Sequence, residues 1–353
     1  MKTWIKLYSL FQIILFMIKS ISDSVAWNDF VYSCSPYTFL QSWEWGQVQK
    51  TTGDDVQYLG FFEEGQQVGA AIVITVNAKR GRHFLIPHGP IAKTEVAAMD
   101  LVPELLEYLK ENNKSKACAI RIAPLLISSK QSLARFKSLG MRPAPLHVHA
   151  ELTWILDISE SEETLLSEMR KTTRHAIGKA ERSDISIEIV EPAKALDRFW
   201  ELYKETKDRH KFTPWPYDML KAQIDIFDAS DKVFAVVATH EGKDVSAAIL
   251  IHFGSTVYYY HGASKRLPSS LPANQLVQWT AIKEAKRRGA TSYNFWGIAP
   301  EDKPEHPFAG ITTFKKGFGG KAYDYMHAHD LSLSLRYYPL LVIESWRRYK
   351  RGF

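Results

Sequence analysis

The segment from Tyr258 to Gly320 decides the fold predicted for this chain. It opens with YYYHGAS (258–264), continues with PANQLVQW (272–279) and YNFWG (293–297), and closes with FKKGFGG (314–320). These pieces predict a strand, a loop, a helix, a second strand and an extended glycine-rich segment that carries two lysines. The helix is expected over 272–289, because Pro272 suits a first helical turn and Gly289 suits the position just past a helix end.

The length and composition of the chain limit the class of protein to which it can belong. The chain has 353 residues, of which 45% are hydrophobic, so it can bury a large core and is long enough for two domains. Its formal net charge is +6, which suits an anionic partner. The two cysteines, Cys34 and Cys118, lack metal-ligand spacing, so we expect buried thiols in a reducing, cytoplasmic compartment.

Four motifs in the chain resemble signatures of one enzyme family. FLQSWEWG (39–46) resembles the N-terminal signature of the FemABX family, and FKKGFG (314–319) resembles its most recognisable motif. The Tyr-x-Tyr-x-Gly-x-Ser pattern from Tyr258 and the Asn-x-Leu-x-Gln-Trp pattern from Asn274 resemble two others. FemABX enzymes are peptidyltransferases that add amino acids from aminoacyl-tRNA to the stem peptide of bacterial cell-wall precursors.

The resemblance implies an α/β (α+β) fold of two tandem acetyltransferase-like (GNAT-like) domains, without the coiled-coil arm of some members. The order of elements in the two halves agrees with such a duplication. We expect the first domain over residues 17–150, completed by 321–353, and the second over 151–320. A strand over 323–333 should return the chain to the first domain, and a basic amphipathic helix should follow over 337–350.

The implied function is aminoacyl transfer in peptidoglycan bridge formation. The donor would be an aminoacyl-tRNA and the acceptor the stem-peptide amine of a UDP- or lipid-linked muropeptide, with no cofactor and no metal. We expect a monomer that contacts the inner membrane surface at most peripherally. The alternatives are a GNAT-like N-acyltransferase that uses an acyl thioester on a polysaccharide precursor, and a non-catalytic tRNA- or membrane-surface-binding protein.

Lys315 is the catalytic candidate. Transfer passes through an oxyanion, which a fixed cation stabilises, and the resemblance assigns this role to the first lysine after Phe314. In an extended segment Lys315 would face away from Phe314 and Lys316, so one lysine would enter the cleft while the other stays solvated. The alternative is a pair of surface lysines on an edge strand.

Other site candidates also come from the resemblance. Tyr258 and Tyr260 lie on one face of a strand and match positions that line the acceptor site, or else they are half-buried strand aromatics. The position of the family's substrate-binding lysine corresponds to Gln49 or Lys50, and we select Lys50 as the candidate. The further substrate-binding candidates are Phe314, Tyr217 and Arg209. Trp279 and Trp296 are assigned to the core, and Asn294, where the family has an aspartate, argues against a general base.

The basic helix after Met169 supplies candidate phosphate contacts for tRNA or the precursor: Arg170, Lys171, Arg174 and Lys179. A solvated helix face is the alternative. Arg174 to Ala180 also resembles the pyrophosphate loop of acetyltransferases, but one residue too many separates Arg174 from Gly178. The patterns His147-x-His149 and His327-x-His329 lack a third ligand at suitable spacing, so no metal site is expected.

Residues 1–16 are either an extension upstream of the fold or a signal-like segment. We favour the extension, because Met17 begins a family-like strand that cleavage after Ala26 would delete.

A chain that starts at Met17 should therefore unfold at the same temperature as the 353-residue chain. Thermal denaturation followed by circular dichroism tests this. A much lower melting temperature, or insolubility, would contradict it.

Overall fold

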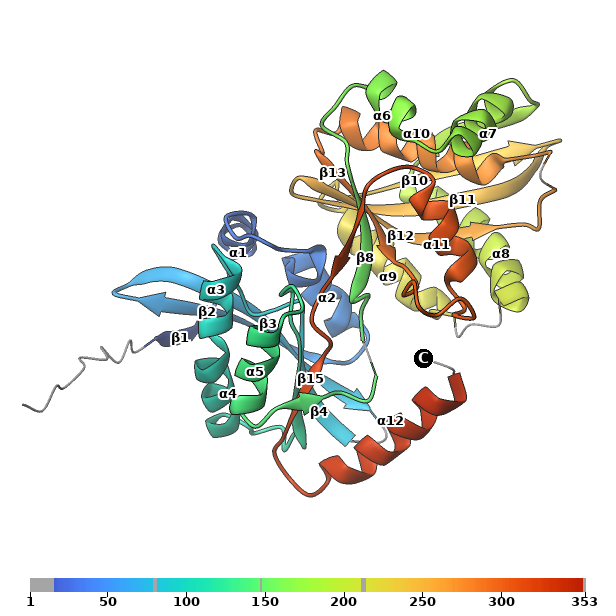
Figure 1. Ribbon diagram of the computed structural model, residues 1–353. Helices are drawn as coiled ribbons and strands as arrows, with labels where there is room; N and C mark the ends of the chain where they lie inside the picture. The colour runs from blue at the N-terminus through green and yellow to red at the C-terminus, as the bar shows by residue number, and fades with distance from the viewer. Residues whose placement is uncertain (1–15, 79–80, 147, 211–213, 269, 352–353) are drawn as a thin grey trace, which may run out of the picture.

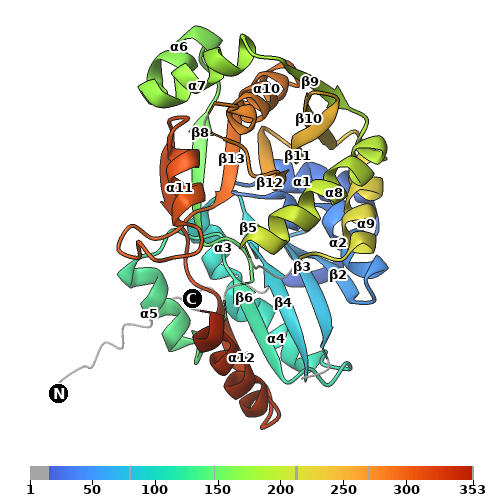
Figure 2. The ribbon, with the colours of Figure 1, turned by 90° about the vertical axis from the view of Figure 1, so that its right-hand side faces the viewer.

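The computed structural model describes residues 16–78, 81–146, 148–210, 214–268 and 270–351. In these residues the strands form two separate sheets, and each sheet carries helices on both faces (Figure 1). Figure 2 shows the same two halves from the side, with the C-terminal helix at the outer edge of the first.

The first sheet, as far as the structure describes it, has eight strands in the order β1-β2-β3-β4-β6-β15-β7, with β5 paired to β3. Parallel pairing joins β4 to β6, and the other pairs are antiparallel. The strands are β1 (Met17–Ser20), β2 (Asp55–Glu63), β3 (Gln66–Ala78), β4 (Gly81–Pro87), β5 (Ile91–Ala92), β6 (Ala119–Ala123), β7 (Arg142–Pro143) and β15 (His329–Ser332).

The second sheet has seven strands among the described residues, in the order β14-β8-β13-β12-β11-β10-β9. Only β12 and β13 are parallel neighbours, because helix α10 (Ala273–Arg287) crosses over between them. The strands are β8 (Leu152–Asp157), β9 (Ile185–Val190), β10 (Val233–His240), β11 (Lys243–Phe253), β12 (Thr256–Ser264), β13 (Ser292–Gly297) and β14 (Lys321–Asp324).

Helices cover the outer faces of the two sheets. The outer face of the first sheet packs on α3 (Glu95–Asp100), α4 (Val102–Glu111) and α5 (Lys130–Ser138). That of the second packs on α7 (Lys171–Glu181) and α10, with α6 (Glu162–Glu168) beside them. Helices α6 and α7 are separate, since the chain is extended at Met169 between them.

One hydrophobic core joins the inner faces of the sheets. It collects side chains from α1 (Ser24–Tyr32), the 3₁₀ turn η1 (Phe39–Gln41), α2 (Trp43–Thr51), α8 (Pro192–His210) and α9 (Tyr217–Asp228). Strands of both sheets face this core, so the two halves share apolar packing rather than a polar interface. Helix α8 lies along strands β10, β11 and β12 and does not project as an arm.

Several predicted elements have the predicted positions. Helix α10 spans 273–287, and Gly289 adopts a φ of +84° just beyond its end, a conformation that glycine allows. Strand β1 begins at Met17 and pairs with β2. Helix α12 (Tyr337–Arg351) covers the helix expected at the C-terminus.

Two predictions need correction. The segment 314–320 is not extended, because Phe314, Lys315 and Lys316 form the last residues of helix α11 (Ala309–Lys316). Two of its glycines follow the helix: Gly319 and Gly320 adopt φ values of +87° and +93°, and they form the turn that leads to β14. The single strand expected over 323–333 is two short strands: β14 extends the second sheet and only β15 returns to the first. The domain division at residue 320 stays a proposal.

A buried ion cluster fixes the returning C-terminal segment. Arg121 on β6 donates hydrogen bonds to Asp330 on β15 at 2.7 and 2.8 Å and to Glu344 on α12 at 2.7 Å. The hydroxyl of Tyr337 donates to Asp330 at 2.9 Å. One guanidinium thus bridges two carboxylates in a largely buried site.

Arg121→Met should lower the free energy of unfolding by about 3–5 kcal/mol, because Asp330 and Glu344 would be left buried without a cation. Urea denaturation measures this loss. Lys110→Met, which removes an exposed ion pair with Glu107, is the control and should change stability by less than about 1 kcal/mol. Equal losses in the two variants would contradict a structural role for the cluster.

Candidate functional site

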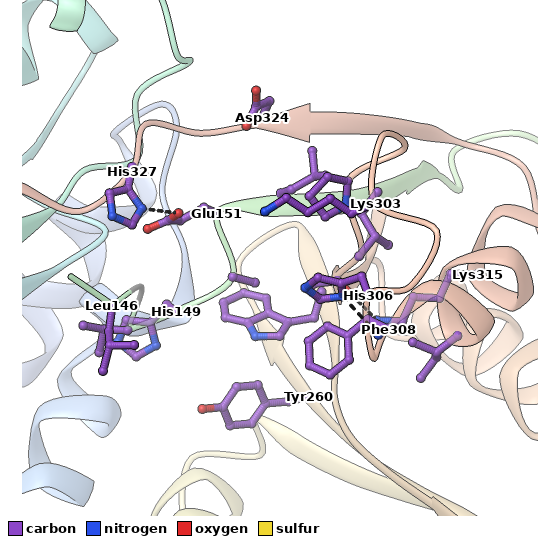
Figure 3. Close-up of a pocket in the computed structure, with 18 of the residues that line it drawn as sticks. Leu146, His149, Glu151, Tyr260, Lys303, His306, Phe308, Lys315, Asp324 and His327 are labelled. Atoms are coloured by element: carbon purple, nitrogen blue, oxygen red, sulfur yellow. Dashed lines mark hydrogen bonds and ion pairs between the residues drawn. The ribbon is translucent and has the colours of Figure 1, made fainter. Parts of the chain in front are cut away.

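A pocket of about 620 Å³ lies where the two halves meet. Its walls come from the connection between the sheets (145–152), the ends of β12 and β13, the loop over 298–308, α11, and α12. Figure 3 shows Lys315, His306 and Phe308 on one side of this pocket and His327, Glu151 and His149 on the other. Residues that are distant in the sequence therefore converge on one cavity.

Lys315 reaches the pocket from α11. Its side chain is buried, with 5% of the residue exposed, and its Nζ donates a hydrogen bond to the carbonyl oxygen of Gly297 at 2.6 Å. Burial disfavours the ammonium form and lowers the pKa of Lys315 to about 7. A lysine that changes charge near neutral pH in a cavity is a candidate for catalysis.

The chain that presents the Gly297 carbonyl has an unusual conformation. Trp296 adopts a φ of +65°, which a bulky side chain rarely takes, and the pairing of β13 with β8 is irregular between Asn294 and Gly297. The side-chain oxygen of Asn294 accepts a hydrogen bond from the backbone N–H of Trp296 at 2.7 Å and so stabilises this turn. Asn294 thus has a structural partner, and Trp296 lines the pocket although the sequence analysis assigned it to the core. Trp279 is in the core, as predicted.

A bulge in β12 brings Tyr260 to the pocket. The pairing with β11 shifts between Ile249 and Leu250, so that Tyr260 is an extra residue and its ring lies beside that of His261, with centroids 4.4 Å apart. The Tyr260 ring packs on Trp296 at 5.7 Å. Burial raises the pKa of Tyr260, so its phenol stays protonated and can donate a hydrogen bond to a ligand.

Glu151 and His327 form a hydrogen-bonded pair on the opposite wall. Nδ1 of His327 lies 2.7 Å from a carboxylate oxygen of Glu151, and its Nε2 lies 2.8 Å from the carbonyl oxygen of Ala144. Burial lowers the pKa of His327, but the hydrogen bond and charge of Glu151 outweigh it, so the net pKa is raised. The imidazolium form can donate to both oxygens at once. Sequence reasoning missed this pair, because 176 positions separate the partners and no local pattern connects them.

The lining as a whole is rich in cationic and aromatic side chains. Lys303 and Arg348 add to Lys315 and His327, whereas the acidic residues of the lining are Glu151 and Asp324. In the described residues no group of three or more side chains is arranged to hold a metal ion. His147 lies outside these residues, and His329 is buried against Phe136.

Comparison of the sequence with known proteins finds two matching family models and distant relatives. The model of the FemAB family matches residues 23–138, and the model of the acetyltransferase (GNAT) domain matches residues 167–315. The lipid II:glycine glycyltransferase of Staphylococcus aureus is 23% identical over 388 aligned residues, which cover 88% of this chain and 92% of that protein. The chain is therefore a distant homologue of FemAB-family proteins over most of its length.

Solved structures agree with the fold. The crystal structure of FemX matches 93% of this chain and 100% of its own with a TM-score of 0.79 at 19% identity. A tandem GNAT protein from the clavulanic acid biosynthesis pathway matches 91% of this chain and 99% of its own with a TM-score of 0.57 at 9% identity. The predicted fold class, two GNAT-like units in tandem, is thereby confirmed.

The predicted site residues do not all gather in the pocket. Lys315 and Tyr260 line it, and the two tyrosines share a face of β12 as expected, but Tyr258 is 1% exposed in the shared core. The Tyr258 hydroxyl donates to the carbonyl oxygen of Tyr37 at 3.4 Å. Phe314 packs against Phe318 behind α11, away from the pocket lining. Direct contact of Tyr258 or Phe314 with substrate stays a prediction.

Three other candidates lie elsewhere on the inner helices. Lys50 lines a separate pocket beside α2, with its Nζ 5.1 Å from the ring centroid of Tyr58. Tyr217 donates a hydrogen bond to Asp197 at 2.7 Å, and Arg209 reaches Ser264 at 3.3 Å. Their roles in substrate binding remain predictions. Trp215, just before α9, does line the main pocket.

The basic helix α7 begins beside α11. The backbone N–H of Arg170 donates to the carbonyl oxygen of Gly317 at 2.9 Å, which places the start of α7 next to the helix that carries Lys315. Arg170 and Lys171 are exposed, and Lys179 is half-buried. Arg174 instead donates to the last carbonyl oxygens of α6, at 2.7 Å from Ser167 and 2.8 Å from Met169. Its guanidinium therefore caps a helix.

The lowered pKa of Lys315 predicts a pH-dependent stability. In the unfolded chain its pKa is near the ordinary value, so between about pH 7 and 10 the unfolded state binds more protons and wild-type stability rises with pH. Lys315→Met should lose this contribution, up to about 1.4 kcal/mol per pH unit. Chemical denaturation at several pH values compares the slopes.

Lys316→Met, which retains Lys315, should keep the wild-type slope. Parallel stability curves for wild type and Lys315→Met would show that the amine of Lys315 has an ordinary pKa and would contradict its desolvation.

Proposed function

We propose that the protein transfers an amino acid from aminoacyl-tRNA to the stem-peptide amine of a peptidoglycan precursor. The observation that carries this proposal is the buried amine of Lys315, held in a cavity between two acetyltransferase-like units of a FemAB-family chain. The related Staphylococcus aureus enzyme is named for transfer of glycine to lipid II, and this supports a muropeptide as the class of acceptor.

In this proposal, Lys315 stabilises the negative charge that develops on the carbonyl oxygen of the ester. Attack of the acceptor amine on the ester carbonyl creates an oxyanion, and the ammonium of Lys315 stabilises it through a charge-assisted hydrogen bond. Collapse of this intermediate breaks the ester C–O bond and releases the tRNA, whose ribose hydroxyl gains the proton that the amine loses. The pKa of about 7 means that the amine is only partly protonated in the empty pocket. The growing negative charge favours the ammonium form, so the interaction strengthens toward the transition state.

The surroundings of Lys315 fit the two substrates. The exposed Arg170 and Lys171, at the start of α7 beside α11, can meet phosphates of a tRNA acceptor end. Across the pocket, Glu151 and Asp324 offer carboxylates to an amine, and the Tyr260 phenol offers a donor to a peptide carbonyl. Donor and acceptor would thus approach Lys315 from opposite sides.

Helix α7 argues against an acyl thioester of coenzyme A as donor. The segment that resembles a pyrophosphate loop, Arg174 to Ala180, lies inside α7 rather than in a loop, and Arg174 is occupied by α6. The second alternative, a non-catalytic binding protein, does not require a lysine that is buried in a cavity.

Lys315→Met should lower the rate of transfer by roughly 10²–10³-fold, the typical effect of losing one oxyanion donor. Acceptor binding should change little, since the charge develops only in the transition state. Single-turnover transfer from charged total tRNA to candidate muropeptides, read by mass spectrometry, measures the rate and identifies the amino acid.

Lys316→Met is the matched control, because Lys316 pairs with Glu301 outside the pocket lining. It should keep most of the activity, whereas Lys315→Arg should rescue only in part, since a guanidinium directs its donors differently. Wild-type rates for Lys315→Met, or a larger loss in Lys316→Met, would overturn the mechanism. Circular dichroism of each variant checks the fold.

A further inference from the structure

The outward face of helix α12 is apolar although it faces water. Val342 is 66% exposed and Trp346 55%, and neighbouring positions at intervals of three and four residues are exposed as well. The exposed apolar side chains of this segment are Leu335, Tyr338, Val342, Ile343, Trp346 and Tyr349. We call these six residues the outer stripe. Contiguous apolar surface of this kind marks an interaction site.

The opposite face of α12 packs against the first sheet, so the outer stripe is not the face that holds the helix on the protein. Tyr337 and Leu340 pack on Cys118 and Ala119 of the first sheet. Glu344, the single acidic residue from Leu335 to the C-terminus, points inward to Arg121 at 2.7 Å. The outer surface of α12 therefore carries no negative charge.

Basic side chains border the outer stripe. Arg336 and Lys350 are exposed at its two ends, and the Nζ of Lys350 lies 4.2 Å above the ring centroid of Trp346. Arg142 lies 5.8 Å from the ring centroid of Tyr338. Apolar side chains with tryptophan and tyrosine, flanked by lysine and arginine, have the chemistry of a helix that lies in the interface of an anionic bilayer.

We propose that the outer stripe docks the protein on the surface of an anionic lipid bilayer. Val342, Ile343 and Trp346 would enter the boundary between headgroups and acyl chains, and Arg336 and Lys350 would contact lipid phosphates. The protein would lie on the membrane, since in the described residues no helix is long and apolar enough to cross a bilayer. The exposed apolar side chains favour this occupant over tRNA, because tRNA offers no apolar surface in which to bury them.

Docking in this way gives the pocket access to a lipid-linked acceptor, a consequence that rests on the function proposed above. Arg348, on α12 itself, lines the pocket that contains Lys315. Figures 1 and 2 both show α12 at the outer edge of the molecule. The muropeptide head of a lipid-linked precursor would then enter the pocket from the membrane side.

Vesicle co-sedimentation tests the docking with the full-length protein. The probes are vesicles of phosphatidylcholine alone and of phosphatidylcholine mixed with phosphatidylglycerol. Wild type should bind the mixed vesicles more tightly, and added salt should weaken this binding. The double variant Val342→Ser/Trp346→Ser should bind them at least about tenfold more weakly, since it removes two inserted side chains.

Val96→Ser is the matched control, because Val96 is 65% exposed on α3, away from α12, and its loss should leave vesicle binding unchanged. Equal binding of wild type and the double variant would overturn the proposal, as would failure of wild type to bind the mixed vesicles. A wild-type dimer that the double variant abolishes, without vesicle binding, would assign the stripe to a second copy instead.

Transfer assays separate this proposal from the proposed function. With a water-soluble UDP-linked acceptor, the double variant should match wild type, whereas with a lipid-linked acceptor in mixed vesicles it should be roughly tenfold slower. Equal rates on both acceptors would overturn the link between docking and substrate. Absence of transfer by wild type to either acceptor would refute the aminoacyl-transfer proposal while the vesicle assay still decides the docking.

Discussion

Both halves of the molecule depend on packing around one side chain, the fully buried ring of Phe39 in η1. Its ring contacts residues of α2, α9, β12 and β13, at centroid distances of 4.9–6.1 Å: Trp45, Phe227, Tyr258, Tyr260 and Trp296. Tyr260 and Trp296 also line the pocket. Because protein cores are close-packed, the shape of the pocket is tied to the interface between the halves. Aromatic packing at this interface therefore helps to set the geometry of the site.

The same interface explains why Lys315 has unusual chemistry. Its amine is enclosed by the loop over 298–308 and by the turn at Trp296, so few water molecules can solvate a charge there. The Lys315 amine donates a hydrogen bond to a neutral carbonyl, that of Gly297, and desolvation is the cause of its lowered pKa. A substrate that brings negative charge into the pocket restores the ammonium. In the proposed mechanism, charge on the lysine and charge on the reacting group therefore appear together.

The C-terminal segment connects the site to the outer surface. After α11 the chain adds β14 to the second sheet and β15 to the first, and the Arg121 cluster then fixes α12. One helix consequently presents Arg348 to the pocket and the outer stripe to solvent. In the proposed docking, the helix that contacts the membrane is therefore also a wall of the pocket that binds the acceptor.

The sequence by itself determined the tandem fold and the elements whose periodicity is local. Helix α10 and strand β1 could be predicted because their end signals and apolar faces lie within a few turns of chain. Lys315 was identified by a motif, yet its helix was not, since nearby glycines suggested an extended segment whereas they act after α11 ends. Only the tertiary structure decided that Trp296 enters the pocket while Tyr258 enters the core, and that Glu151 meets His327. Those outcomes depend on a bulge, a left-handed turn and a contact across 176 positions, and local sequence patterns carry no information about which distant side chains will meet.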